Sequence, residues 1–195
     1  MPTQRHHGLL IVLCGPSGVG KSTISRQLAE RSDVSYTVSA TTRPKKEKDD
    51  EGKTYEHIAQ DEFFRRLDGD EFLEYAHVYG HYYGTPKHPA LDLLEAGKDV
   101  LLEIDVQGAL QVRYQYPDAL MLFILPPNEH TLLQRLNDRG RDDADDISKR
   151  FRAAKREIHM AKGSRAFDFF VFNDDLDHCV DELTRIITLE RTGGL

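Results

Sequence analysis

The chain has 195 residues, of which 39% are hydrophobic, 30% charged and 9% aromatic. This length and composition suit one folded domain, or one domain with a small insert, and they exclude a disordered, collagen-like or coiled-coil chain. The formal net charge of −7 argues against a general nucleic-acid-binding surface, although a small anionic ligand could still bind in a local basic pocket.

Nothing in the sequence indicates a membrane segment or an exported protein. The longest apolar runs, Leu9–Cys14 and Ala119–Leu125, are far shorter than the ~18 residues that a membrane-spanning helix needs. The amino-terminal apolar stretch is also too short for a signal peptide. Cys14 and Cys179 do not have the spacing of a disulfide framework or a metal site. We therefore expect a cytoplasmic protein that does not bind membranes.

The first predicted elements are a strand, a glycine-rich turn and a helix. Leu9–Cys14 is typical of a strand buried on both faces, and Ser22–Arg31 carries apolar side chains at helical spacing. Further strands are predicted at Asp99–Ile104, Ala119–Leu125 and Asp168–Phe172, and further helices at Gly108–Tyr116, Asn128–Arg139 and Asp175–Arg191. This alternation predicts an α/β fold with a parallel sheet flanked by helices.

Two stretches depart from the alternation. Thr41–Thr85 holds a polar loop and then short aromatic-rich runs, which favours a small antiparallel insert over another strand-helix unit. Gly140–Asp146 is too polar to pack in a core and joins two helical segments, so we expect it to form the tip of a mobile flap. The aromatic-rich runs are Lys53–Ile58, Phe72–Val78 and His81–Gly84.

The glycine-rich turn matches the phosphate-binding loop (P-loop) pattern GxxxxGK[ST]. Glycines let successive backbone N–H groups point at phosphate oxygens, and the following helix adds the positive end of its dipole. In this pattern Lys21 bridges the β- and γ-phosphates and Ser22 ligates Mg²⁺. The sequence therefore predicts a nucleoside-triphosphate site. Its residues are Gly15, Pro16, Ser17, Gly18, Val19, Gly20, Lys21, Ser22 and Thr23.

A P-loop enzyme also needs an acid near the metal, usually at the end of a neighbouring strand. Glu103 and Asp105 follow the apolar residues of a predicted strand and are the candidates. A GTPase is disfavoured because the chain has no NKxD motif, and Asp105–Gly108 has the DxxG spacing in the wrong setting for a switch.

Taken together, these motifs resemble those of the guanylate kinase family, from about Leu9 to about Leu189. The resemblance is specific because it depends on many motifs in a fixed order. They are Gly15–Thr23, Ser39–Pro44, Gly52 with Tyr55, Phe72–Ala76, Tyr82–Thr85, Glu103–Gly108, Arg139 with Gly140, and Asn173–Asp175.

The resemblance implies one domain over about 8–190 that transfers the γ-phosphoryl of ATP to GMP, giving ADP and GDP with Mg²⁺, for GMP recycling and GTP supply. The P-loop core would comprise 1–38 and 89–195, with a small mixed α/β GMP-binding insert at 39–88 and a short helical lid at about 138–150. Its partners would be the two nucleotides, with no nucleic acid, membrane or obligatory protein partner.

The resemblance also implies residue roles. Glu74 would accept the two N–H donors that guanine presents side by side, and Thr85 would donate to guanine O6. The residues expected to bind GMP are Ser39, Arg43, Lys46, Tyr55, Glu74, Tyr83, Thr85 and Asp105. Arg139 and Asn173 would bind ATP together with the P-loop, and Ser22 and Asp105 would hold the metal. The residues expected to act in catalysis are Lys21, Arg43, Arg139 and Arg150.

Three alternatives stay open. Most relatives have an arginine where this chain has Lys46, and a lysine holds phosphate less firmly, while Lys45 or Lys48 could reach the phosphate instead. The chain could be a catalytically inactive module that binds phosphopeptides, although such modules usually lose the P-loop lysine or the lid arginines. A related kinase with another phosphorylated acceptor, such as a ribose bisphosphate, is the third.

Overall fold

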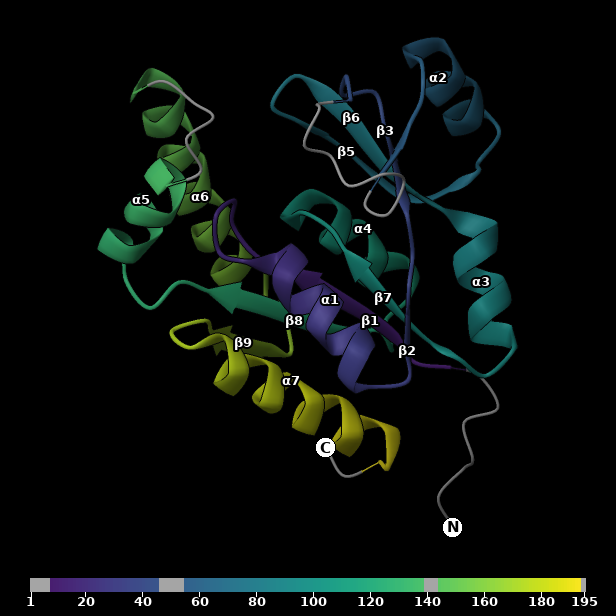
Figure 1. Cartoon of the computed structure of the whole chain (residues 1–195). Helices are drawn as coiled ribbons and strands as arrows, with labels where there is room; N and C mark the ends of the chain where they lie inside the picture. Colours follow the sequence, from purple (N-terminus) through teal and green to yellow (C-terminus); the bar gives the residue numbers. More distant parts are fainter. Residues whose placement is uncertain (1–7, 46–54, 139–143, 194–195) are drawn as a thin grey trace.

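Two sheets organise the chain, one parallel and one mixed (Figure 1). The computed structural model describes residues 8–45, 55–138 and 144–193. The parallel sheet has the order β2 (Val34–Tyr36), β7 (Asp99–Glu103), β1 (Leu10–Cys14), β8 (Leu120–Leu125) and β9 (Phe169–Phe172). Every pairing in it is parallel, which confirms the predicted α/β core.

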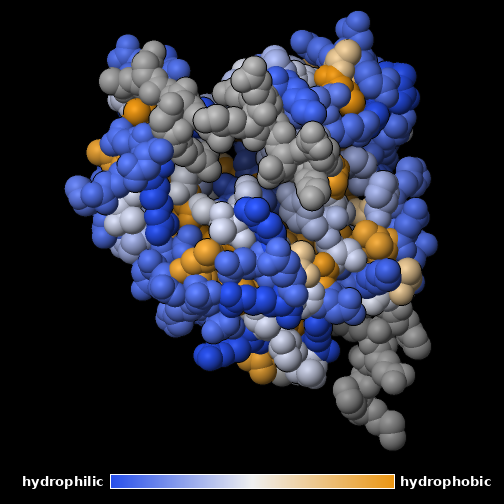
Figure 2. All heavy atoms as spheres, in the orientation of Figure 1, coloured by the Kyte–Doolittle hydropathy of each residue, from blue (hydrophilic) through white to orange (hydrophobic). Residues whose placement is uncertain are grey.

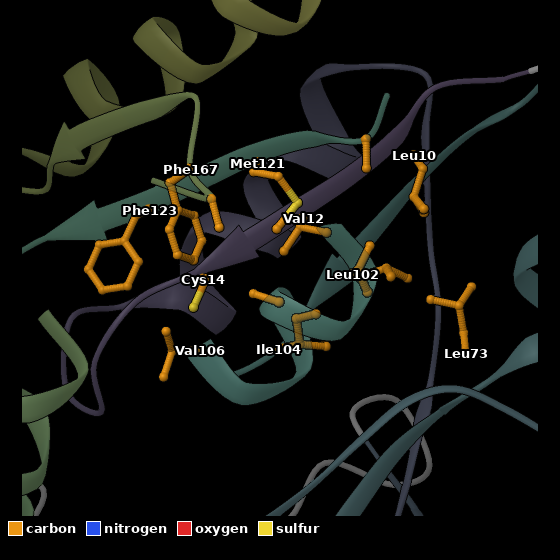
Figure 3. Close-up of a cluster of buried hydrophobic side chains, with 14 of the residues drawn as sticks. Leu10, Val12, Cys14, Leu73, Leu102, Ile104, Val106, Met121, Phe123 and Phe167 are labelled. Carbon is orange, nitrogen blue, oxygen red and sulfur yellow. The ribbon is translucent and has the colours of Figure 1, made fainter. Parts of the chain in front are cut away.

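The central strand β1 is buried on both faces because its side chains alternate between two cores. Ile11 and Leu13 pack with α1 (Lys21–Arg31) and α7 (Leu176–Arg191). Val12 and Cys14 point to the opposite face, toward Met121 and Phe123 in Figure 3, where α3 (Lys87–Glu95) and α4 (Val106–Gln115) contribute. An unbroken apolar strand is what this arrangement requires.

The mixed sheet forms the insert, in the order β4 (Tyr55–His57), β3 (Ser39–Thr41), β6 (His81–Pro86) and β5 (Phe72–Val78). The expectation of an antiparallel insert is wrong at β3 and β4, which pair in parallel. Residues 42–54 separate the two strands, which is long enough for the crossover that parallel strands need. The strand pattern did not predict helix α2 (Gln60–Asp68). Its Phe63 ring stacks on the ring of Phe72, with 4.6 Å between the centroids.

The insert is anchored to the core through β5 and α4. Leu73 of β5 belongs to the same buried cluster as Val12 (Figure 3), and the Gln111 side-chain amide in α4 donates a 2.6 Å hydrogen bond to the Tyr75 carbonyl. Alternate side chains of β5, including Glu74 and Ala76, line the same cavity as Asp105, which lies between β7 and α4. This junction positions the site described below.

Helices α5 (Glu129–Asp138) and α6 (Ala144–Ser164) pack side by side through Leu132, Leu136 and Ala154. Residues 140–143 of the expected flap lie outside the described residues. Asp145 and Asp146 are in the first turn of α6, so the expectation of a loop is wrong there. The residues at 144–150, expected in a short lid helix, begin a helix of 21 residues that ends at Ser164, and Ala161 near its end packs in the core.

The described helices include none that is both apolar enough and long enough to span a membrane. Figure 2 shows mainly hydrophilic residues on the visible face, with hydrophobic residues scattered among them. Such isolated apolar residues are normal on the surface of a folded protein.

Candidate active site

The P-loop connects β1 to α1 as a tight curl. Gly18 and Gly20 have φ of 87° and 101°, a left-handed conformation that disfavours residues with a Cβ. A Cβ on Gly20 would also lie only 2.7 Å from the Asn173 amide nitrogen. The curl and the start of α1 at Lys21 supply the backbone arrangement that binds an anion at a helix amino terminus.

Asn173 and Val19 support this loop from inside the protein. The buried Asn173 amide donates a 2.7 Å hydrogen bond to the Val19 carbonyl, and the Val19 side chain packs in the core. Both were expected among the ATP-contacting residues, and the structure gives each a packing role beneath the loop. Arg135 adds a 3.0 Å hydrogen bond from its guanidinium to the Asn173 carbonyl.

Lys21 lies over its own loop. Its ammonium donates hydrogen bonds of 2.5 Å to the Gly15 carbonyl and 3.3 Å to the Pro16 carbonyl. The side chain is therefore already beside the loop where phosphates would lie. To reach a γ-phosphate it would exchange these carbonyls for phosphate oxygens, which are stronger partners for a cation.

The hydroxyl of Ser22 is hydrogen-bonded to Glu103 at the end of β7, with 2.7 Å between Oγ and Oε1. The second Glu103 oxygen accepts a longer hydrogen bond of 3.4 Å from Tyr36. Burial, followed by the negative charge of Glu103, raises the pKa of Tyr36, so this phenol stays protonated and able to donate. Glu103 is thus the acid that contacts the P-loop serine.

Asp105 has a different position. It is the N-cap of α4, and its Oδ1 accepts a 2.9 Å hydrogen bond from the Gly108 backbone N–H. Burial raises the pKa of this carboxyl, while the Gly108 N–H and the nearby Lys21 act in the opposite direction. Asp105 nevertheless faces the same cavity as Glu103 and Ser22.

Glu74 is a carboxylate buried in the insert, on β5, with only 4% of its surface exposed. Its Oε1 accepts two hydrogen bonds from Thr85 on β6, 2.6 Å from the hydroxyl and 3.1 Å from the backbone N–H. Ser39 on β3 adds a 3.4 Å contact between its hydroxyl and that of Thr85. Burial raises the pKa of Glu74 to about 7, and the charge of Asp105 acts in the same direction.

Arg43 and two tyrosines gather at the other side of the insert sheet. The Arg43 guanidinium lies 5.9 Å from the centroid of the Tyr55 ring. The rings of Tyr55 and Tyr83 meet edge to face, with centroids 5.6 Å apart. One cation and two phenols therefore share a small region. Lys46, expected with them, lies outside the described residues.

A cavity of about 640 Å³ joins these groups. The P-loop lines one side of it, and Ser39, Tyr55 and Glu74 of the insert line the other. This volume is within the usual range for small-molecule sites. The P-loop and a buried carboxylate, which can accept hydrogen bonds, therefore face one shared space.

Helix α6 contributes Arg150 and Glu157 to this cavity. The Arg150 guanidinium lies 5.4 Å from the ring centroid of Tyr79, at the turn between β5 and β6. Burial raises the pKa of Glu157, whose carboxylate faces Lys21 and is hydrogen-bonded by the backbone of Ser17. Arg139, expected beside Arg150, lies outside the described residues.

The family model for guanylate kinase matches residues 7–190 of the chain. The chain belongs to the guanylate kinase family. It is 43% identical to guanylate kinase of Caldanaerobacter subterraneus subsp. tengcongensis over 188 residues, which cover 96% of this chain and 90% of that protein. It is 44% identical to guanylate kinase of Symbiobacterium thermophilum over 185 residues, which cover 94% of this chain and 86% of that protein.

Solved structures agree with the family assignment. A guanylate kinase from Anaplasma phagocytophilum superposes with a TM-score of 0.79 at 30% identity, covering 95% of this chain and 87% of that one. The SH3-kinase fragment of tight junction protein 3 has a TM-score of 0.53 at 14% identity, which shows a shared fold alone. The expected guanylate-kinase-like fold is thereby confirmed.

Several residues at the site of this guanylate kinase family member were given no role in the sequence analysis, and Arg135, Tyr79 and Glu157 are three of them. Arg135 contacts the loop that Asn173 supports, while Tyr79 and Glu157 line the cavity. Helical spacing could have indicated Glu157, because it lies seven residues, or two helical turns, after Arg150. Tyr79 gives no such signal, since only the hairpin turn carries it to α6.

Proposed function

We propose that this chain transfers the γ-phosphoryl group of ATP to GMP and releases ADP and GDP. The observation that carries the proposal is that the buried Glu74 carboxylate faces the same cavity as the P-loop. A P-loop alone is common to many enzymes, whereas a buried carboxylate opposite it selects an acceptor that offers hydrogen-bond donors.

Guanine is the purine that satisfies Glu74. Its Watson–Crick edge presents two adjacent N–H donors, and a carboxylate accepts both, whereas adenine would place an acceptor against the same oxygens. Thr85 and Ser39 adjoin Glu74, and their hydroxyls are the donors we assign to guanine O6. Asp105 faces the cavity from the end of β7 and completes this pocket in the proposal.

The phosphates are assigned to the two basic ends of the cavity. The P-loop amides and Lys21 bind the triphosphate, and Arg43, Tyr55, Tyr83 and Lys46 bind the GMP phosphate, since cations and phenols both donate to phosphate oxygens. Arg150 and Arg139 stabilise the charge that spreads over the transferring phosphoryl group, in a cavity from which the nucleotides exclude water.

The donor set next to Ser22 fits Mg²⁺. The Ser22 hydroxyl and the Glu103 carboxylate are in contact, Asp105 faces the same space, and all three offer the oxygen ligands that Mg²⁺ prefers. No cluster of three His, Cys, Asp or Glu side chains able to hold a metal occurs in residues 8–45, 55–138 and 144–193. A magnesium ion that arrives with ATP suits such a site, and it neutralises charge on the β- and γ-phosphates.

The setting of the reaction is part of the proposal. ATP and GMP are the binding partners, and the GDP produced supports GTP supply. A cytoplasmic location is favoured because Cys14 and Cys179 are free thiols, which suit a reducing compartment.

The experiment is a coupled assay of ADP release with ATP, Mg²⁺ and a panel of monophosphates: GMP, AMP, CMP and UMP. We expect turnover with GMP, much less with AMP, and none when EDTA removes Mg²⁺. An inactive phosphopeptide-binding module would release no ADP with any acceptor. A kinase for another phosphorylated compound would be inactive with the whole panel and active with a ribose bisphosphate.

A further inference from the structure

Gly108 occupies the first turn of α4, where glycine is a poor choice. Its φ is not in the left-handed region, so the backbone does not require glycine there. Its N–H is hydrogen-bonded to Asp105 Oδ1, as in any capped helix. After proline, glycine is the least favourable residue in a helix. A reason for Gly108 must therefore come from outside α4.

That reason is contact with Glu74. A Cβ on Gly108 would lie 2.1 Å from Glu74 Oε2 and 2.9 Å from its Cδ, far inside normal contact distances. By contrast, a Cβ on Gly163, a glycine of α6, would meet nothing within 4 Å. The carboxylate of Glu74 thus packs directly against the bare backbone of α4.

Glu74 has little freedom to move away from an added side chain. Its other oxygen is held by the hydroxyl and the backbone N–H of Thr85, and its neighbour Leu73 is fixed in the main core cluster. Because the carboxylate lies between β6 and α4, a methyl group at position 108 would force it out of this place or rotate it away from Thr85.

We propose that Gly108 is a positioning residue for acceptor specificity: the missing side chain lets the Glu74 carboxylate lie against α4 at the angle that receives the guanine edge. This inference rests on the proposed function, in which Glu74 accepts the two guanine N–H groups. Gly108 acts through Glu74 and makes no contact with the reacting atoms.

The kinetic test is Gly108→Ala, assayed with GMP and AMP as acceptors. We expect the ratio of kcat/KM for GMP to that for AMP to fall by about tenfold, as expected when a buried hydrogen-bonding group is misplaced. The KM for ATP should change little, because the P-loop is not touched. A fall of less than about threefold in this ratio, including the case in which both acceptors lose activity equally, overturns the proposal. Gly163→Ala is the matched control and should leave all these constants unchanged.

A second measurement tests the contact without using activity. In a Glu74→Ala background the space beside Gly108 is vacated, so Gly108→Ala should raise Tm there, as alanine favours helix, and lower Tm in the wild-type background. Gly163→Ala should shift Tm equally in both backgrounds. An equal change in Tm from Gly108→Ala in the two backgrounds would overturn the proposed contact between position 108 and Glu74. If wild-type protein did not phosphorylate GMP, the proposed function would fail while this Tm coupling would still report on Gly108 and Glu74.

Discussion

The Ser22 hydroxyl and the Glu103 carboxylate, 81 residues apart in the chain, meet at 2.7 Å. β1 and β7 are neighbours in the parallel sheet, so the start of α1 and the end of β7 lie at the same edge. This geometry orients the serine that P-loop enzymes use to bind the metal. The sequence offered Glu103 and Asp105 as acids near the metal, and the family resemblance assigned the metal to Ser22 and Asp105. In the structure it is Glu103 that is hydrogen-bonded to Ser22.

Replacing Glu103 by Gln should keep a hydrogen-bond partner for Ser22 and remove the negative charge. We expect kcat to fall by about tenfold or more, and the Mg²⁺ concentration for half-maximal activity to rise, as is usual when a group supporting a metal ligand is changed. Glu129→Gln is the control, because this exposed residue at the start of α5 pairs with Lys155 of α6 and does not line the cavity. An unchanged Mg²⁺ dependence in Glu103→Gln would contradict a role near the metal.

Glu74→Gln should relax acceptor selectivity. A Gln side chain places one amide donor against the guanine donors, so kcat/KM for GMP should fall by about tenfold or more, equivalent to about 1–3 kcal/mol for a mispaired buried group. The kcat/KM for AMP should fall much less. The measurement is the ratio of kcat/KM for the two acceptors, with Thr85→Ser as a conservative control. An unchanged ratio in the mutant would show that Glu74 does not contact the acceptor base.

The raised pKa of Glu74 predicts a pH-dependent stability. The carboxyl has a pKa of about 7 in the folded protein, against 4.5 for the ordinary group, so between these values the folded state binds more protons than the unfolded chain. The free energy of unfolding therefore falls as pH rises through this range, by on the order of 3 kcal/mol for this group. Tm measured from pH 4.5 to 8 should decline less in Glu74→Gln than in wild type.

The same titration should affect GMP binding in the opposite sense. Only the ionised carboxylate accepts both guanine donors, so the KM for GMP should rise as pH falls below about 7. The GMP phosphate itself titrates near pH ~6, so Glu74→Gln is needed to separate the two effects. A pH profile of KM that is identical in mutant and wild type would exclude Glu74 as the titrating group.

Lys21→Ala should abolish turnover and leave the fold intact, since the Lys21 ammonium donates hydrogen bonds to carbonyls of its own loop. GMP binding, followed by calorimetry without ATP, should change little because the lysine serves the triphosphate. Lys162→Ala, at the end of α6, is the control. Retention of more than about a tenth of kcat, a barrier increase below ~1.4 kcal/mol, would be inconsistent with this assignment.

Tyr79→Ala should lower kcat more than it changes the KM for GMP. The ring lies against the Arg150 guanidinium at 5.4 Å, and a cation–π contact of about 1 kcal/mol corresponds to about fivefold in rate if it holds Arg150 toward the cavity. Tyr79→Phe retains the ring and should retain most of the activity. If Tyr79→Phe and Tyr79→Ala lower kcat equally, the contribution of Tyr79 comes from its hydroxyl and not from the contact between its ring and Arg150.

The parallel core could be predicted because its signals are local. Leu10–Cys14 is apolar throughout, and the glycines that follow it are spaced for one kind of turn, so a strand, a phosphate loop and a helix follow from neighbouring residues alone. The insert was harder. β3 and β4 have three residues each, too few to show a strand period, and their parallel pairing depends on a crossover that no local pattern reveals.

The sequence by itself determined the family and the candidate residues of the site, because the P-loop pattern and the family motifs can be identified one by one. Tertiary structure decided how those residues are used. The burial of Glu74, its contact with Gly108 and the choice of Glu103 as partner of Ser22 all depend on how β5, α4 and β7 pack. Residues 34 or 81 positions apart have no periodic relation along a chain, so only the packing of the two sheets against shared helices brings Glu74 against Gly108 and Glu103 against Ser22.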